Sequence, residues 1–158
     1  MPVRIRRGGE GDLEVVSDLW ASLAREMDAM DRYLDLDEDF LDKGRRYFRE
    51  NLRAEEFHIW LAEDEGEAVG FLCAKVERPG PIFVPRPWLH IMDLYVRPSY
   101  RRRGVARALM EAALGWAREQ GLESADLSVY STNPARRLYE DLGFVPYRVI
   151  MRKDLSRG

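Results

Sequence analysis

Three consecutive arginines, Arg101 to Arg103, stand just before Gly104 and a helical pattern in the stretch VRPSYRRRGVARAL. The first turn of a helix leaves backbone N–H groups unpaired and carries roughly half a positive charge, so it attracts anions. Gly104 has no Cβ and Ala106 is small, which leaves room for a close anion and allows a positive φ at Gly104. Arginine adds planar, charge-assisted donors that match phosphate oxygens. The stretch therefore predicts a cradle for a pyrophosphate group.

The arginine run has two other interpretations, a solvated charge run without a ligand and a contact for nucleic acid. The chain of 158 residues has a net charge of -3 and no basic face elsewhere, which argues against nucleic acid. The place of the arginines, between a predicted strand and a glycine-led helix, favours the cradle over a solvated run. Neither common nucleotide motif is present, since the sequence lacks both G-x-x-x-x-G-K-S/T and G-x-G-x-x-G.

Two candidates for proton transfer, His90 and Asp93, lie in the predicted strand WLHIMDLYV. Side chains alternate along a strand, so the predicted faces are His90, Met92, Leu94 and Val96 on one side and Ile91, Asp93 and Tyr95 on the other. Imidazole has an ordinary pKa of about 6.5, so His90 is a candidate general base, acting directly or through water. A structural histidine is the alternative for His90, and an orienting hydrogen bond inside the fold is the alternative for Asp93.

The rest of the pattern predicts the elements that position these residues. Apolar spacing of three and four residues predicts helices, and alternation between turn residues predicts strands. The expected strands span residues 3–7, 57–62, 68–76, 88–96, 125–130 and 145–155, and the expected helices span residues 13–30, 37–53, 104–120 and 133–143. This order predicts one domain, residues 1–158, with a mixed α/β sheet layered by helices.

The stretch VRPSYRRRGVARAL resembles the acetyl-CoA signature of the GNAT N-acetyltransferase superfamily, Q/R-x-x-G-x-G/A, with Arg101, Gly104 and Ala106 in its defined positions. A second, independent stretch, NPARRLYEDLGF, resembles the short helix of that superfamily at Asn133, Ala135, Tyr139, Gly143 and Phe144. The close resemblance covers residues 89–147. It implies a GNAT-like fold, α/β (α+β), with a mixed, mostly antiparallel central sheet, splayed parallel strands at the cofactor cleft and helices on both faces.

The resemblance also implies acetyl-CoA as co-substrate, and no metal. The backbone of Leu94, Tyr95 and Val96 would pair with the pantetheine amides, as an added strand does. The pyrophosphate would meet the backbone amides and side chains of Arg101, Arg102, Arg103, Gly104, Val105 and Ala106. Asn133 would hydrogen-bond the pantetheine arm or simply cap its helix.

The implied reaction is direct attack of a primary amine on the thioester, without an acyl-enzyme. By the resemblance, Tyr139 stands near the sulfur and protonates the leaving thiolate; packing of the short helix is the alternative role. Members of the superfamily often carry a carboxylate at the place of His90 or Met92, and this sequence has none there. The general base therefore stays open between His90, Asp93 and water, and Asp93 is also a candidate contact for the acceptor. A non-catalytic acyl-CoA-binding or regulatory module of the same fold is the alternative function.

The predictions about the acceptor and the cellular compartment depend on the composition of the chain. Acidic side chains are concentrated in REMDAMDRYLDLDEDFLD, which predicts attraction of a small-molecule, peptide or protein amine; a solvated acidic loop is the alternative. No apolar run approaches the ~20 residues of a membrane span, and the N-terminus lacks the apolar segment of a signal peptide, so we expect a cytoplasmic protein without membrane contact. Cys73 is the only cysteine, which excludes an internal disulfide and a cysteine-based metal cluster. The proline-rich segment before Trp88 is a candidate homodimer contact.

Overall fold

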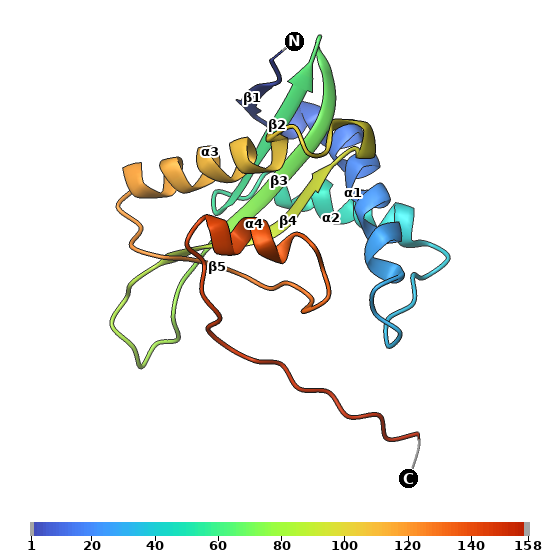
Figure 1. Ribbon diagram of the computed structural model, residues 1–158. Coiled ribbons are helices and arrows are strands. Elements are labelled where there is room, and N and C mark those ends of the chain that lie inside the picture. Colours follow the sequence, from blue (N-terminus) through green and yellow to red (C-terminus); the bar gives the residue numbers. More distant parts are fainter. Residues whose placement is uncertain (1, 157–158) are drawn as a thin grey trace. The chain divides into compact units, whose positions relative to one another are not determined.

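The structure is a computed structural model that describes residues 2–156 (Figure 1). The chain divides into two compact units, Met1–Ser128 and Val129–Gly158. The first unit holds the sheet and the long helices, and the second holds one short α-helix among its described residues. The expectation of a single domain over residues 1–158 stays a prediction.

A five-stranded sheet forms the centre of the first unit. In sheet order its strands are β1 (Arg4–Arg7), β2 (Phe57–Asp64), β3 (Glu67–Glu77), β4 (Trp88–Val96) and β5 (Ala125–Leu127). The pairs from β1 to β4 are antiparallel, and β4 pairs with β5 in parallel. The expected mixed, mostly antiparallel sheet is therefore confirmed. The bounds of β4 are those that the sequence predicts.

Helices cover both faces of this sheet (Figure 1). Helices α1 (Leu13–Asp28) and α2 (Phe40–Asn51) lie behind it, and α3 (Val105–Glu119) lies in front of it. On the α1 and α2 side, the core is a buried apolar cluster of Val16, Leu19, Phe48, Phe57, Ile59, Leu61, Ala68, Phe71, Cys73 and Tyr95. Alternate residues of β2 join this cluster because a strand presents every second side chain to the same layer. The buried position expected for Cys73 is confirmed.

Two short 3₁₀ helices follow strands β1 and β4. The first, η1 (Glu10–Asp12), follows β1 and is held to it by Arg6, which donates to Asp12 Oδ1 at 2.7 Å and pairs with Glu63 at 3.0 Å. The bond from Arg6 lowers the pKa of Asp12 below its ordinary value. The second, η2 (Pro98–Tyr100), follows β4 and leads toward the start of α3.

The predicted hairpin of β2 and β3 is confirmed, and both of its strands run longer than predicted. The two turn residues, Glu65 and Gly66, have φ values of +51° and +82°. Positive φ at both central residues matches the twist of a two-residue hairpin, and the glycine adopts it at little cost.

The predicted strand over residues 145–155 is wrong for this structure. Its alternating apolar residues predict one buried strand face, yet no described strand of the sheet pairs with it. Val145 is 77% exposed and Met151 is 89% exposed. A strand exists only where a neighbouring backbone accepts and donates its hydrogen bonds, and side-chain alternation does not provide that neighbour. For the same reason β5 ends at Leu127 rather than at residue 130.

The contact between α1 and α2 depends on a glycine. An added Cβ at Gly44 in α2 would overlap the ring of Trp20 in α1. We therefore expect Gly44→Ala to lower the free energy of unfolding by about 1–3 kcal/mol, the usual cost of overpacking, in urea titrations. Gly115→Ala in α3 is the matched control, because nothing lies within 4 Å of its added Cβ. That control should be neutral or stabilise by up to about 1 kcal/mol. Equal losses in the two variants would contradict the packing argument.

Candidate active site

Strand β4 contains a bulge at Met92. Cys73 of β3 pairs with Asp93 and the next residue, Ala74, pairs with Ile91, so Met92 is an extra residue on β4. A bulge shifts the alternation of side chains beyond it. Asp93 contacts Cys73 within the core on the α1 and α2 side, and Met92 packs against the same core. The predicted alternation is therefore wrong past Ile91, since Asp93 and Tyr95 lie on the face that His90 and Met92 occupy.

The parallel pairing of β4 with β5 stops directly before this bulge. The paired residues are Leu89 with Ala125, His90 with Asp126 and Ile91 with Leu127. Beyond Ile91, β4 continues to Val96 without a further partner on β5. The expected parting of two parallel strands is thus present, with the backbone of Leu94 to Val96 beyond it. Val96 already uses its carbonyl oxygen, which accepts a hydrogen bond from Arg101 Nε at 2.8 Å.

The loop before α3 has the backbone form that the cradle requires. Gly104 has a φ of +79°, in the left-handed region where glycine is favoured, and Arg102 has a φ of +62°. The N-cap residue of α3, Gly104, has no side chain with which to cap the helix. Open space surrounds the position where a Cβ of residue 104 would stand. The unpaired N–H groups at the start of α3 are thus available to an anion.

The side chains of Arg101 and Arg103 make different contacts around this loop. Arg101 is held within the protein: besides its bond to Val96, it pairs with Glu26 of α1 at 2.6 Å. The Arg103 guanidinium lies 4.8 Å from the ring centre of Tyr100, whose hydroxyl donates to Asp64 at 2.6 Å. The Arg101 side chain is therefore bonded within the protein, and the roles of Arg101, Arg102 and Arg103 toward a cofactor stay predictions.

His90 has a carboxylate partner that the sequence did not indicate. His90 Nδ1 lies 2.7 Å from Asp126 Oδ1, and Trp88 Nε1–H donates to the same oxygen at 3.1 Å. The His90 and Asp126 side chains are 34% and 43% exposed, so solvent and small molecules reach both. Asp126 was missed because only the register of β4 on β5 places it opposite His90.

Asp93 and Cys73 form a buried acid–thiol pair. Cys73 Sγ donates to Asp93 Oδ2 at 3.2 Å. Burial raises the pKa of both groups, which keeps Cys73 a thiol at neutral pH. Nearby, Tyr47 donates its hydroxyl to Met92 Sδ at 3.9 Å, and burial together with the charges of Cys73 and Asp93 raises the pKa of Tyr47 to about 12. Asp93 thus makes a hydrogen bond inside the fold, and its candidate roles as general base and as acceptor contact stay predictions.

The second unit carries the other two predicted site residues. Asn133 Oδ1 accepts a hydrogen bond from the backbone N–H of Ala135 at 3.0 Å, so Asn133 caps the chain as it enters α4 (Arg136–Asp141). Tyr139 lies in α4 with its ring centre 6.2 Å from that of Phe144. The roles of Asn133 and Tyr139 toward a cofactor stay predictions.

The acidic stretch is tied mainly into its own segment. Asp37 pairs with Lys43 at 2.6 Å and accepts the N–H of Asp39, while Asp28 accepts the N–H of Leu36. Within residues 2–156, no group of three His, Cys, Asp or Glu side chains is arranged to bind a metal ion. The pairings of the stretch match a structured acidic loop as well as they match a binding rim.

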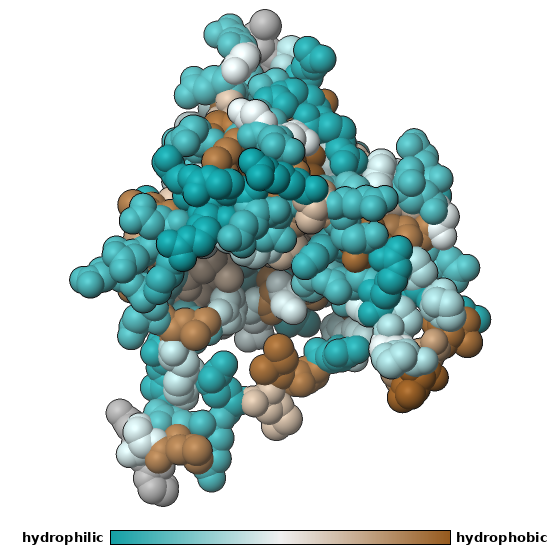
Figure 2. Space-filling model, turned by 180° about the vertical axis from the view of Figure 1, so that it is seen from behind, coloured by the Kyte–Doolittle hydropathy of each residue, from teal (hydrophilic) through white to brown (hydrophobic). Residues whose placement is uncertain are grey.

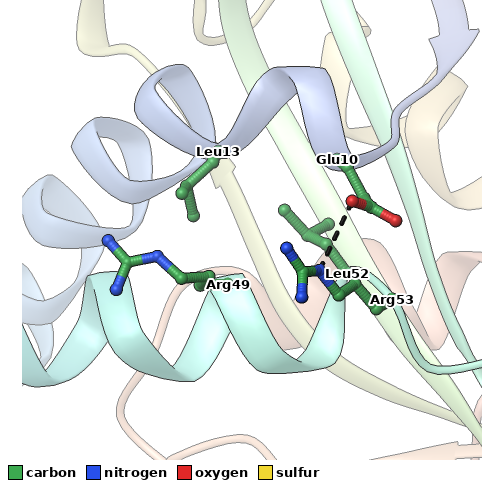
Figure 3. Close-up of a pocket in the computed structure, with 5 residues that line it drawn as sticks. All are labelled: Glu10, Leu13, Arg49, Leu52 and Arg53. Atoms are coloured by element: carbon green, nitrogen blue, oxygen red, sulfur yellow. Dashed lines mark ion pairs between the residues drawn. The ribbon is translucent and has the colours of Figure 1, made fainter.

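A pocket lies between η1 and the end of α2 (Figure 3). It is lined by Glu10, Leu13, Arg49, Leu52 and Arg53. Glu10 and Arg53 face each other across it and form an ion pair at 3.4 Å. None of the predicted site residues lines this pocket, and two of its charged groups, Glu10 and Arg53, pair with each other.

Apolar residues also reach the surface in several separate places (Figure 2). In the proline-rich loop before β4, Ile82 is 86% exposed, Phe83 is 63% exposed and Val84 is 68% exposed. The homodimer contact suggested for this loop stays a prediction.

Comparison with known proteins identifies the family. The family model described as Acetyltransferase (GNAT) family matches residues 20–144. The chain belongs to this family. The matched range includes β4, the cradle loop and α4, so it contains both stretches on which the resemblance rested.

Two curated relatives of this GNAT protein are N-acetyltransferases by name. An N-alpha-acetyltransferase of Sulfurisphaera tokodaii is 32% identical over 110 residues, or 66% of this chain and 66% of that protein. An uncharacterized N-acetyltransferase of Archaeoglobus fulgidus is 36% identical over 96 residues, or 60% of this chain and 65% of the relative. The match thus spans about two thirds of the length of each relative.

Solved structures share the fold. A tetramutant of the BH1408 protein from Bacillus halodurans has a TM-score of 0.86 at 20% identity, over 96% of this chain and 99% of that chain. The aminoglycoside N-acetyltransferase AAC(6')-Iy in complex with CoA has a TM-score of 0.78 at 23% identity, over 98% of this chain and 95% of that chain. The GNAT-like fold that the sequence predicts is confirmed.

The raised pKa of Asp93 predicts how stability depends on pH. The folded protein holds the Asp93 proton more tightly than the unfolded chain does, so this group stabilises most at low pH. Its contribution is lost as pH rises above the ordinary aspartate pKa of about 4. We therefore expect the free energy of unfolding of wild type, minus that of Asp93→Asn, to fall with rising pH in urea titrations.

Asp12→Asn is the control of opposite sign. Because Arg6 lowers the pKa of Asp12, the contribution of Asp12 is present above the ordinary aspartate pKa and is lost as pH falls. The corresponding difference for Asp12→Asn should rise with pH over the acid range. Differences of the same slope for both variants would contradict the assignment of Asp93.

Proposed function

We propose that this chain is an acetyl-CoA-dependent N-acetyltransferase that moves the acetyl group to a primary amine by direct attack, without an acyl-enzyme. The observation that carries the proposal is the uncapped start of α3 behind a left-handed Gly104, directly after a strand that has parted from its parallel neighbour. Membership of the GNAT family and the names of the relatives support it. So does the fold shared with an aminoglycoside N-acetyltransferase whose structure contains CoA.

The residues present fit the cofactor. The backbone of residues 102–106 would hold the pyrophosphate through N–H groups that lack a capping side chain. The backbone of Leu94 and Tyr95 would pair with the pantetheine amides in the gap that opens past Ile91. When bound, acetyl-CoA supplies a thioester carbonyl that an amine is able to attack.

The side chains then have three tasks. A lysine-like amine has a pKa of about 10.4 and must lose a proton before it attacks, which is the task of His90. A backbone N–H of β4 beyond the bulge would stabilise the oxyanion that forms. Tyr139 would return a proton to the leaving thiolate, as the phenol of the matching family position does.

The competing function is an acyl-CoA-binding module without turnover. Both functions need the cradle, so binding of acetyl-CoA alone does not separate them. The separating test is release of free CoA thiol when the protein, acetyl-CoA and a panel of amines are mixed. The panel should include aminoglycosides, polyamines and peptides with free N-termini. The first group is chosen because one structure of AAC(6')-Iy holds the bisubstrate analog CoA-S-monomethyl-acetylneamine, and the last because a relative is named N-alpha-acetyltransferase.

The compartment stays a prediction. Within residues 2–156, no helix combines the length and the apolar character needed to cross a membrane.

The cradle predicts a charge-reversal effect at Gly104. Gly104→Asp places a carboxylate beside the pyrophosphate and strains a left-handed backbone, so acetyl-CoA binding measured by calorimetry should be lost. Gly121→Asp at the other end of α3 is the matched control, since its φ is +80° and nothing lies within 4 Å of its added Cβ. The control has the same strain and the same charge change, and should bind with wild-type affinity. Unchanged binding of acetyl-CoA by Gly104→Asp would contradict the prediction that this loop binds the pyrophosphate.

The proposed acid predicts a loss in turnover without a loss in binding. Tyr139→Phe removes only the hydroxyl, so the affinity for acetyl-CoA should stay within about twofold while kcat falls by about 10²-fold or more. Calorimetry and thiol release measure the two quantities separately. Tyr147→Phe, at an exposed tyrosine in the same unit, is the control and should leave both unchanged. Wild-type kcat in Tyr139→Phe would assign the tyrosine to packing.

A further inference from the structure

We propose that Asp126 is the positioning residue for His90, fixing the tautomer in which His90 Nε2 accepts the proton of the attacking amine. The inference rests on the proposed function and names a residue that deepens it. It starts from the register of β4 on β5, which sets His90 and Asp126 directly opposite each other.

The hydrogen bonds around Asp126 define the direction of the imidazole. His90 Nδ1 and Trp88 Nε1 lie 2.7 Å and 3.1 Å from the same oxygen, Asp126 Oδ1. An indole N–H only donates, and an ionised carboxylate only accepts. A neutral His90 therefore carries its proton on Nδ1, and its lone pair is on Nε2. A carboxylate so placed also stabilises the imidazolium that forms once Nε2 has taken a proton.

The place of the pair in the sheet suits this task. His90 and Asp126 form the second-last pair between β4 and β5, and Ile91 with Leu127 forms the last. The bulge at Met92 follows directly on β4. The His90 side chain is 34% exposed, as a group that meets a bound amine must be in part. The amine, the cofactor thioester and His90 would meet where the two parallel strands part.

Other charged groups surround His90. Lys75 lies opposite it on β3, and Glu77 lies opposite Trp88 on that same strand. Asp93 is close enough to interact with His90 electrostatically, and Tyr47 of α2 reaches Met92 beside it. Among these groups Asp126 is the carboxylate in hydrogen-bond contact with the ring, so it decides the tautomer.

The protons of the step balance as follows in this proposal. The ammonium form of the amine gives one proton to His90 Nε2, and the free amine then attacks, so that the nitrogen–carbonyl bond forms and the carbon–sulfur bond breaks. The thiolate receives a proton from Tyr139 or from water, the second proton that leaves the nitrogen replaces it, and His90 returns its proton to solvent. Asp126 exchanges no proton and touches neither substrate.

The first experiment is histidine NMR of the neutral imidazole, which needs no turnover. The chain has two histidines, so the His90 signals are assigned with His90→Gln. Asp126→Asn should weaken the preference for the tautomer with the proton on Nδ1, because a neutral amide oxygen is a weaker acceptor than a carboxylate. Nitrogen shifts in wild type should report the proton on Nδ1. Glu123→Gln, an exposed carboxylate shortly before β5, makes the same charge change and should leave the His90 signals unmoved. An unmoved His90 signal in Asp126→Asn would overturn the proposal.

The second experiment measures kcat/KM against pH by thiol release with an amine that the wild type acetylates. Asp126→Asn should lower kcat/KM by about 10- to 100-fold, within the 10²–10⁴ that a general base contributes. The double variant His90→Gln with Asp126→Asn should be no slower than His90→Gln alone, since Asp126 acts only through His90. Additive losses would overturn the proposal. A wild type that binds acetyl-CoA but acetylates no amine would instead refute the proposed function, while the NMR result still reports on the pairing.

Discussion

The short parallel contact between β4 and β5 is the constraint on which the rest of this structure depends. A longer ladder would use the β4 backbone past Ile91 for sheet hydrogen bonds and leave none for a ligand. Here the ladder ends at Leu127, and the bulge at Met92 follows at once. The loop to α3 therefore begins after a section of β4 that does not pair with β5, and the positive end of α3 lies next along the chain.

Backbone and side chains have different functions around this opening. The part assigned to the cofactor is almost entirely backbone: strand amides, a left-handed glycine and the uncapped start of a helix. The part assigned to proton transfer is made of side chains on the paired section, His90 with its carboxylate partner Asp126. This separation fits a family in which the donor is shared and the acceptors differ, since backbone groups do not change with substitution.

Much of the fold and the cradle could be predicted from the sequence, because those features are local. Apolar spacing gave β4 its bounds, and the residues around Gly104 determine their own backbone form. The bulge at Met92 could not be predicted, since it arises from how β3 and β4 align rather than from the composition of either strand. The contact between Asp126 and His90 was missed for a related reason, because it depends on the register of β5 against β4. For the segment 145–155 the sequence predicted a strand that the structure lacks. Alternating apolar residues indicate a strand but do not show which other strand would pair with it.

The double attachment of Arg101 has a consequence for communication within the first unit. One guanidinium bridges the last carbonyl of β4 and the carboxylate of Glu26, near the end of α1. The end of α1, which leads into the acidic segment, and the end of β4, which leads to α3, are therefore joined through one side chain. Under the proposed function, a displacement of the acidic segment by an acceptor would reach the acetyl-CoA site through this arginine, which would favour an ordered addition of the two substrates.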